Sequence, residues 1–330
     1  MNWKNKKVLV TGADGFIGSH LVEELAASQA KVRAFVYYNS FNNWGWLDTL
    51  PKDTLKKIDV FTGDVRDSNN VLIASKNIHI VFHLAALIGI PFSYHAPDSY
   101  VDTNIKGTLN ILQAARQWGL EKIIHTSTSE VYGTAQYVPI NEAHPINPQS
   151  PYAATKSAAD DLALSFYRSF NLPIAILRPF NTFGPRQSAR AIIPTIITQI
   201  LSGSKSIKLG NLNARRDFNY VSNTVDAFIK IAETPKSVGK ILNVGSGQET
   251  TIMELAQVIQ DVLKREVKIT TEKQRLRPEK SEVERLLCDA TQIKKIGGWS
   301  PRVSFKEGIK LTCDWLKKNL KQYKTDVYNV

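Results

Sequence analysis

The chain has 330 residues, of which 43% are hydrophobic and 22% are charged, as in an ordinary globular protein. Its net charge is +12, but the lysines are scattered and form no basic stripe interleaved with aromatic residues, so no nucleic-acid binding is predicted. No segment approaches the roughly 18–20 consecutive apolar residues of a membrane span. The two cysteines have no histidine at metal-ligand spacing, and a cytoplasmic protein without a metal is expected.

Short apolar runs alternate with helical patterns along the first half of the chain. The expected strands are Val8–Val10, Val32–Val36, Ile58–Phe61, Ile80–His83, Lys122–His125 and Pro173–Leu177. The expected helices are Phe16–Ala27, Ser99–Trp118 and Ala153–Phe170. Strands alternating with helices predict an α/β fold with a Rossmann-type, doubly wound parallel sheet.

A glycine-rich turn joins the first expected strand to the first expected helix. The turn contains Gly12, Gly15 and Gly18, which permit a tight turn and a close approach of the backbone to a pyrophosphate. The free N–H groups at the start of the helix, at Phe16 and Ile17, would bind that anion. The spacing G-x-x-G-x-x-G differs from the standard dinucleotide fingerprint, so the strand–turn–helix context is needed to predict a dinucleotide site.

The end of the second strand bears on the choice of cofactor. Proteins that prefer NAD usually place an acid there, about 20 residues after the turn, to hold the ribose 2′-hydroxyl. Residues Val36–Ser40 contain neither an acid that would repel the 2′-phosphate of NADP nor an arginine that would bind it. The sequence therefore slightly favours NADP over NAD as the cofactor. Asp64 and Val65, after the third strand, are candidates for contact with the adenine.

The pattern changes beyond Arg178, where prolines and glycines become frequent. We predict a dinucleotide-binding domain over residues 1–180. Residues 181–330 are expected to form mainly a second domain, which binds the sugar nucleotide. Ile241–Val244, followed by a helical pattern over Met253–Lys264, looks like one more βα unit. Residues 240–250 are therefore expected to return to the first domain.

Tyr152 and Lys156 stand four residues apart at the start of a helical stretch and share one of its faces. A lysine ammonium beside a phenol favours the phenolate and is expected to lower the tyrosine pKa, which makes a usable base. Thr128, Ser129 and Glu130 follow a buried strand, where a parallel sheet opens into its active-site crevice. The two sets together predict a catalytic site.

The chain resembles the extended short-chain dehydrogenases/reductases that act on nucleotide sugars. The matching motifs, in order, are TGADGFIG (11–18), HLAA (83–86), STSEVYG (127–133), YAATK (152–156), RPFNTFGPR (178–186) and RRDFNYV (215–221). They span nearly the whole chain. The sequence looks most like the 4,6-dehydratases of nucleotide-linked N-acetylglucosamine in nonulosonic acid pathways of the legionaminic and pseudaminic type.

The resemblance implies a tightly bound cofactor that is regenerated in each turnover. Beside the glycine-rich turn, Tyr152 and Lys156, it implies cofactor contacts from Leu84, Ala85, Ala86 and Asn104, with His83 packed nearby rather than acting as a base. It places Asn181, Arg216 and Arg277 at the sugar nucleotide. The planar fork of arginine suits phosphate, so Arg216 and Arg277 are candidates for the diphosphate.

In the dehydratase branch, a ketone at sugar C4 makes the C5 proton acidic, and Glu130 matches the carboxylate that removes it. Tyr152, assisted by Lys156 and Thr128, would take the C4 hydroxyl proton while a hydride passes to the cofactor, and that hydride would return to C6 after water leaves. Many 4,6-dehydratases carry an Asp before this Glu to protonate the leaving hydroxyl. Here that position is Ser129, a poor general acid, so Glu130 is expected to serve both steps.

Two alternatives stay open. The same Thr-Ser-Glu set is found in UDP-glucuronate decarboxylases, although the apolar loop at 88–92 offers no cation to a C6 carboxylate unless Arg186 or Arg215 approaches from the other domain. The other alternative is an epimerase or reductase acting on a keto-sugar nucleotide, although epimerases usually carry a small or hydroxyl residue in place of Glu130. The sequence does not identify the nucleotide as UDP or GDP.

The expected partners are the nucleotide-sugar substrate and a second copy of the chain. The helical stretches at 99–118 and 153–170 resemble those that pair into a four-helix bundle between two subunits of the family. The resemblance therefore implies a homodimer.

Overall fold

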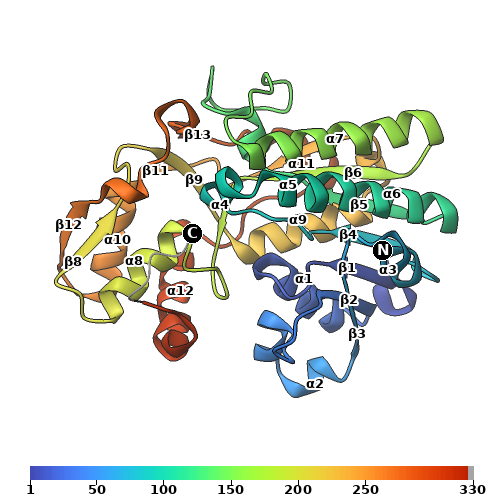
Figure 1. Ribbon diagram of the computed structural model, residues 1–330, viewed down its shortest axis with the longest axis horizontal. Coiled ribbons are helices and arrows are strands. Elements are labelled where there is room, and N and C mark those ends of the chain that lie inside the picture. Colours follow the sequence, from blue (N-terminus) through green and yellow to red (C-terminus); the bar gives the residue numbers. More distant parts are fainter. Residues whose placement is uncertain (326–330) are drawn as a thin grey trace.

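The computed structural model describes residues 1–325. At its centre lies a seven-stranded parallel sheet with the strand order β10-β6-β5-β4-β1-β2-β3 (Figure 1). The strands are β1 (Lys7–Thr11), β2 (Lys31–Tyr37), β3 (Ile58–Gly63), β4 (Ile80–His83), β5 (Lys122–Thr126), β6 (Ile174–Pro179) and β10 (Ile241–Val244). This is the doubly wound Rossmann order with β10 added at one edge, so the predicted fold class is confirmed.

Helices cover both faces of the sheet. One face packs against α3 (Ser68–Ala74), α6 (Gly107–Trp118) and α7 (Pro151–Phe170), and the other against α1 (Phe16–Ala27) and α9 (Val221–Glu233). Successive residues of β1 point to opposite faces of the sheet. Leu9 packs on the face covered by α3, α6 and α7, whereas Val8 and Val10 pack on the face covered by α1 and α9. Burial on both faces explains why these strands read as continuous apolar runs.

The helix expected over 99–118 is divided into three parts. It comprises α5 (Pro97–Tyr100), a π-helical segment (Val101–Lys106) and α6. The Thr108 hydroxyl of α6 donates to the carbonyl oxygen of Asn104 in the π-helical segment over 2.6 Å, and the Asn104 side chain bonds outside the helix. Wide turns of this kind often lie at functional sites.

The rest of the chain forms a smaller, less regular part. Its main sheet has β9 (Arg215–Tyr220) paired with β7 (Asn181–Phe183), β11 (Glu249–Thr251) and β13 (Arg285–Leu286), and β8 (Ser206–Leu209) pairs with β12 (Lys268–Thr271). Its helices are α8 (Ile192–Leu201), α10 (Ile252–Leu263) and α12 (Phe305–Asn319). The shorter helices of the chain are α2 (Lys52–Leu55), α4 (Ile90–His95) and α11 (Thr291–Gly297). The strand expected at 241–244 is β10 and pairs in parallel with β6 of the main sheet.

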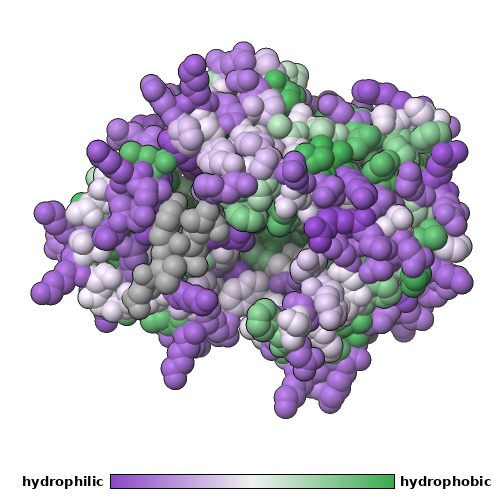
Figure 2. All heavy atoms as spheres, in the orientation of Figure 1, coloured by the Kyte–Doolittle hydropathy of each residue, from purple (hydrophilic) through white to green (hydrophobic). Residues whose placement is uncertain are grey.

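The two parts face each other across a hollow, which Figure 2 shows with hydrophobic residues at its floor. An aromatic cluster links them at one side. Trp46, in the segment after β2, lies 5.6 Å from Trp315 of α12 and 5.9 Å from Tyr323, measured between ring centroids. The Tyr323 hydroxyl donates to the Gln187 carbonyl oxygen over 2.9 Å. Within residues 1–325, no helix combines the length and apolar character that a bilayer crossing requires.

A buried lysine fastens the sheet to α9. Lys122, at the start of β5, donates from Nζ to the carbonyl oxygens of Ile231 (2.7 Å), Ala232 (3.2 Å) and Thr234 (2.7 Å). The last carbonyl groups of a helix have no partner within the helix, and a cation there also complements the helix dipole. Burial lowers the pKa of Lys122 to about 8.

We predict that Lys122→Met lowers the free energy of unfolding by about 2–4 kcal/mol, because it removes three charged hydrogen bonds at the end of α9 and leaves only the Ile231 and Thr234 carbonyl groups with donors from Thr234 and Ser237. Denaturant unfolding followed by circular dichroism measures this change. Lys6→Met is the matched control, since Lys6 forms a solvent-accessible ion pair with Glu121 and should change stability by less than about 1 kcal/mol. Equal effects of the two substitutions would contradict the capping role of Lys122.

Candidate active site

The glycine-rich turn between β1 and α1 has the shape that a pyrophosphate requires. Gly12 adopts φ = +66°, and a side chain at Gly18 would clash with the Gly12 carbonyl oxygen. Gly15 is the N-cap of α1 and supplies no side chain to the first N–H groups of the helix. The amides of Phe16 and Ile17 are therefore available to an anion, and the turn fits a dinucleotide.

The HLAA motif follows β4 and is held by β1. The Thr11 hydroxyl oxygen accepts hydrogen bonds from the amides of Leu84 and Ala85, both over 3.1 Å, and lies 2.8 Å from Nδ1 of His83. Nε2 of His83 lies 3.1 Å from the Thr108 hydroxyl. Burial lowers the pKa of His83 well below its usual value. His83 is thus a neutral core residue that shapes the turn, as expected.

Asn104 binds the loop that follows the same motif. Its Nδ2 donates to the Leu87 carbonyl oxygen and to the Thr155 hydroxyl, both over 3.0 Å, and its Oδ1 accepts from the Leu87 amide over 2.9 Å. Asn104 is almost fully buried. The sequence places it among the cofactor contacts, whereas the structure uses its amide to join the loop after β4 to α7.

The candidate adenine contacts lie after β3. Asp64 forms a two-pronged contact with Arg66, whose Nη2 and Nε approach its carboxylate at 2.5 Å and 2.9 Å. Burial raises the pKa of Asp64, but the hydrogen bonds and charge of Arg66 outweigh it, so the net pKa is lowered. Val65 is buried against Gly107 of α6.

The Thr-Ser-Glu set begins a short 3₁₀ helix (Ser129–Tyr132) just after β5. Thr128 caps this helix, because its hydroxyl oxygen accepts from the Glu130 amide over 3.2 Å. Ser129 and Glu130 are both buried, with 2% and 9% of their surface exposed. This hydrogen bond fixes the backbone position from which the Glu130 side chain extends.

Tyr152 and Lys156 share one face of α7, as the sequence predicts. The Ser150 hydroxyl caps the helix through the Ala153 amide over 3.1 Å, and Pro151 occupies its first position. Asp160 lies four residues beyond Lys156 on the same face and is buried.

The pKa values of this pair differ from the expectation. Burial raises the pKa of Tyr152, with a smaller opposing effect from the Thr128 hydrogen bond and a further rise from the nearby Glu130 charge. Burial lowers the pKa of Lys156 to about 8, and Asp160 partly opposes that shift. In this state desolvation outweighs the expected influence of the ammonium on the phenol.

Asp160 is the functional candidate that sequence reasoning missed. Its carboxylate accepts from the Ser127 hydroxyl over 2.7 Å and from Nη2 of Arg178 over 2.9 Å, and it lies 3.3 Å from Nε2 of His125. The only sequence signal was an acid four residues after Lys156, and such spacings are common in helices.

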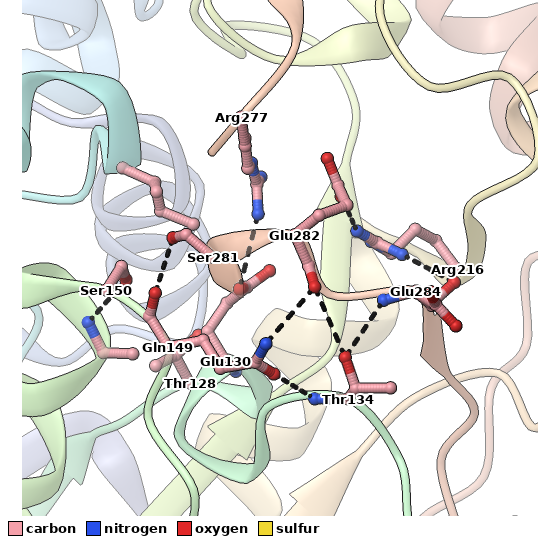
Figure 3. Close-up of polar contacts among 12 residues, drawn as sticks. Thr128, Glu130, Thr134, Gln149, Ser150, Arg216, Arg277, Ser281, Glu282 and Glu284 are labelled. Atoms are coloured by element: carbon pink, nitrogen blue, oxygen red, sulfur yellow. Dashed lines mark hydrogen bonds and ion pairs between the residues drawn. The ribbon is translucent and has the colours of Figure 1, made fainter. Parts of the chain in front are cut away.

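Two arginines approach Glu130 from the smaller part of the chain (Figure 3). Nη1 of Arg277 lies 3.7 Å from the Glu130 carboxylate. Arg216, in β9, is 6% exposed and directs its guanidinium to Glu282 over 3.3 Å, within the field of Glu130. Asn181 begins β7, and its Oδ1 is buried and unpaired among residues 1–325. The structure thus brings Arg216 and Arg277 together.

The segment that carries Arg277 is fastened to the base of α7. Gln149 donates to the carbonyl oxygens of Lys280 (2.9 Å) and Glu282 (3.3 Å), and its Oε1 accepts from the Thr134 amide. Figure 3 shows the contacts of Gln149 with Glu282 and Thr134. Residues far apart in the sequence therefore form one side of the hollow.

The chain is similar in sequence and in fold to known proteins. Residues 9–312 match the family model described as GDP-mannose 4,6 dehydratase. The chain is 31% identical to the dTDP-D-glucose 4,6-dehydratase of Mus musculus, over 97% of this chain and 91% of that protein. It superposes on a Streptomyces venezuelae dTDP-glucose 4,6-dehydratase, DesIV, solved as a double mutant with NAD (TM-score 0.87, 27% identity, 96% and 98% of the two chains). It also superposes on the Methanobrevibacter ruminantium UDP-N-acetylglucosamine 4-epimerase (TM-score 0.86, 33% identity, 96% and 99%).

The match runs through both parts of the chain, from the glycine-rich turn to α12. It joins dehydratases and epimerases, whose shared features are the Rossmann sheet and a nucleotide-sugar site. The chain belongs to the extended short-chain dehydrogenase/reductase family of nucleotide-sugar dehydratases and epimerases.

Proposed function

We propose that the protein is a nucleotide-sugar 4,6-dehydratase that acts on a UDP- or GDP-linked N-acetylglucosamine. The observation that carries this proposal is the buried Glu130 carboxylate, close enough to Tyr152 to raise its pKa. Removal of a C5 proton needs a base beside the group that oxidises C4. An exchange of configuration at C4 needs no such second carboxylate, which favours dehydration over the epimerase alternative.

The chain's residues divide the work as follows. Tyr152 takes the C4 hydroxyl proton, with Thr128 in hydrogen-bond contact and Lys156 one helical turn away. The bound nicotinamide supplies the hydride acceptor and donor. Glu130 removes the C5 proton and delivers it to the C6 hydroxyl, which leaves as water. The hydride would then return to C6, and a proton equivalent to the one that Tyr152 took would return to C5, so that one water is the net loss. Ser129 is buried beside Glu130 and has no pKa near 7, so it does not replace Glu130 as the acid.

The substrate class rests on the resemblance and on the wall of the hollow. The M. ruminantium relative is named for UDP-N-acetylglucosamine, so the family accepts an N-acetylated sugar. In this chain Ile88 and Phe92, after β4, are exposed apolar side chains that suit a neutral sugar. We place the enzyme in a pathway toward nonulosonic acids of the legionaminic or pseudaminic type.

The cofactor is a nicotinamide dinucleotide held at the glycine-rich turn, and we propose that it stays bound through turnover. The S. venezuelae relative is solved with NAD. The prediction of NADP rests only on the lack of an acid at 37–40.

We also propose that two copies of the chain pair through α6 and α7 to form a homodimer. The localisation that we propose is cytoplasmic. The two helices pack side by side, and Trp118 and Phe170 near their ends are exposed. Exposed aromatic side chains on neighbouring helices suit an interface.

One observation favours a second candidate, the decarboxylation of UDP-glucuronate. Arg277 provides a cation beside Glu130, where a C6 carboxylate would lie. Arg186 and Arg215 do not serve this purpose, because Arg186 pairs with Glu23 of α1 and Arg215 pairs with Glu249. Arg277 is therefore the residue that would distinguish the two reactions.

For the dehydratase, Glu130→Gln is expected to lower the rate of water loss by about 10²- to 10⁴-fold, because the amide cannot take up the C5 proton. Mass spectrometry of products from UDP-N-acetylglucosamine and GDP-N-acetylglucosamine measures this loss. Glu279→Gln, which changes an exposed acid two residues from Arg277, should stay within about twofold. Full activity of Glu130→Gln would rule out the proposed base.

For UDP-glucuronate, we expect no release of CO₂ by the wild-type protein. Release of CO₂ that is abolished in Arg277→Met would establish the second candidate and reject dehydration. If wild-type protein leaves all three nucleotide sugars unchanged, the substrate is a different or already oxidised sugar nucleotide, and the dehydratase proposal in this form is wrong.

The rate is also expected to fall as pH rises through about 8, because Lys156 then loses the positive charge that would favour ionisation of Tyr152 as it takes the C4 hydroxyl proton. The raised pKa of Tyr152 keeps the tyrosine itself out of this range. Initial rates between pH 6.5 and 9.5 show this limb, and a flat profile would contradict it.

Unfolding does not account for such a limb. Lys156 has a lower pKa in the folded chain, about 8, than the usual 10.5, so the unfolded chain binds more protons between these values and this group makes stability rise with pH. Melting temperatures across the same range are the control. Lys122→Met, which removes the other lysine with a pKa of about 8, should retain the limb.

A further inference from the structure

The adenosine half of a dinucleotide in a Rossmann fold lies between the glycine-rich turn and the end of the second strand. In this chain β2 ends at Tyr37, and the residues after it are Tyr38, Asn39 and Ser40. None of them carries a charge. The acid that usually selects NAD is therefore absent from its usual place.

A carboxylate reaches the same place from a different segment. Asp14 lies inside the glycine-rich turn, between Gly12 and Gly15, and its Oδ2 accepts from the Tyr37 amide over 3.3 Å. The Asp14 carbonyl oxygen accepts from the Trp46 amide over 3.0 Å, and Gly45 packs directly on the Asp14 backbone. The turn and the segment after β2 thus hold Asp14 between them.

The Asp14 carboxylate has capacity for another donor. An ionised carboxylate offers about four acceptor sites, and the Tyr37 amide uses one of them. The side chain is partly exposed, so a ligand can reach it. Burial raises the pKa of Asp14, and hydrogen bonds from the backbone of Tyr37 and of Asp14 itself oppose this rise only in part.

We propose that Asp14 selects the cofactor by accepting a hydrogen bond from the adenosine 2′-hydroxyl of NAD and repelling the 2′-phosphate of NADP. The residue takes over the task of the missing acid at the end of β2. This inference reverses the lean to NADP from the sequence, which considered only residues 36–40.

Arg66 is the competing determinant. Its Nη2 lies 3.4 Å from the Tyr37 hydroxyl, near the end of β2, and a guanidinium there could bind a 2′-phosphate. Its charge is already balanced by Asp64, with which it makes three hydrogen bonds from Nε and Nη2. Asp14 has no such cationic partner among its contacts within residues 1–325.

The test is a calorimetric titration of the full-length protein, stripped of cofactor, with NAD and with NADP. Wild-type protein should bind NAD at least about tenfold more tightly, since like charges at a binding site cost several kcal/mol. Asp14→Asn should reduce this preference about tenfold or more, mainly by tighter binding of NADP. Asparagine can still accept from the Tyr37 amide, so the turn is preserved.

Asp48→Asn is the matched control. The Asp48 carboxylate also accepts a hydrogen bond from a backbone amide, that of Trp44, and Asp48 lies on the segment after β2 that packs on Asp14. It should change the preference less than about twofold. Equal shifts in the two variants, or equal binding of NAD and NADP by wild-type protein, would overturn the proposal. A loss of NADP binding in Arg66→Met that exceeds the gain in Asp14→Asn would overturn it in favour of Arg66. The wild-type titration decides even if a variant fails to fold, and none of these readings depends on which sugar is turned over.

Discussion

The active site depends on one buried carboxylate, that of Asp160. It lies on α7 one turn beyond Lys156, and it is held by Ser127 after β5 and by Arg178 in β6. Two strands and the helix that carries Tyr152 are therefore joined at a single point. Removing one partner of a buried ion pair typically costs about 3–5 kcal/mol, because the other charge stays buried. The position of Tyr152 relative to the end of β5 is fixed by this constraint.

The constraint extends across the sheet through other buried polar groups. Nη1 of Arg178 donates to the Tyr132 hydroxyl over 3.0 Å, and Tyr132 donates to Asn243 of β10 over 2.8 Å. On the other side, the ring of His125 lies 5.7 Å from that of His83 in β4. A buried network whose members are mostly paired is rigid. The candidate catalytic side chains, on the short segment after β5 and on α7, can therefore keep their relative positions.

The parts of this arrangement that the sequence reveals are the local ones. Alternating apolar runs and helical patterns predict the doubly wound parallel sheet, and a four-residue spacing places Tyr152 and Lys156 on one face. The tasks of Asp160 and Asp14 were not predictable, because each depends on a partner from a distant strand: Arg178 in β6 and the end of β2. The raised pKa of Tyr152 was missed for a similar reason, since burial is a property of the whole fold.

The contact between Arg277 and Glu130 shows how such a site can accept a charged substrate. An isolated charge is costly to bury, whereas a charge that already has a partner is not. In this structure Arg277 faces the Glu130 carboxylate, and on the proposed function it would also face the diphosphate of the substrate. The Arg277 guanidinium would then pair with the Glu130 carboxylate, with the diphosphate, or with both. Its charge is therefore never buried without a partner. Because Arg277 belongs to the smaller part of the chain and Glu130 follows β5 of the main sheet, the charge balance of the proposed reaction depends on both parts.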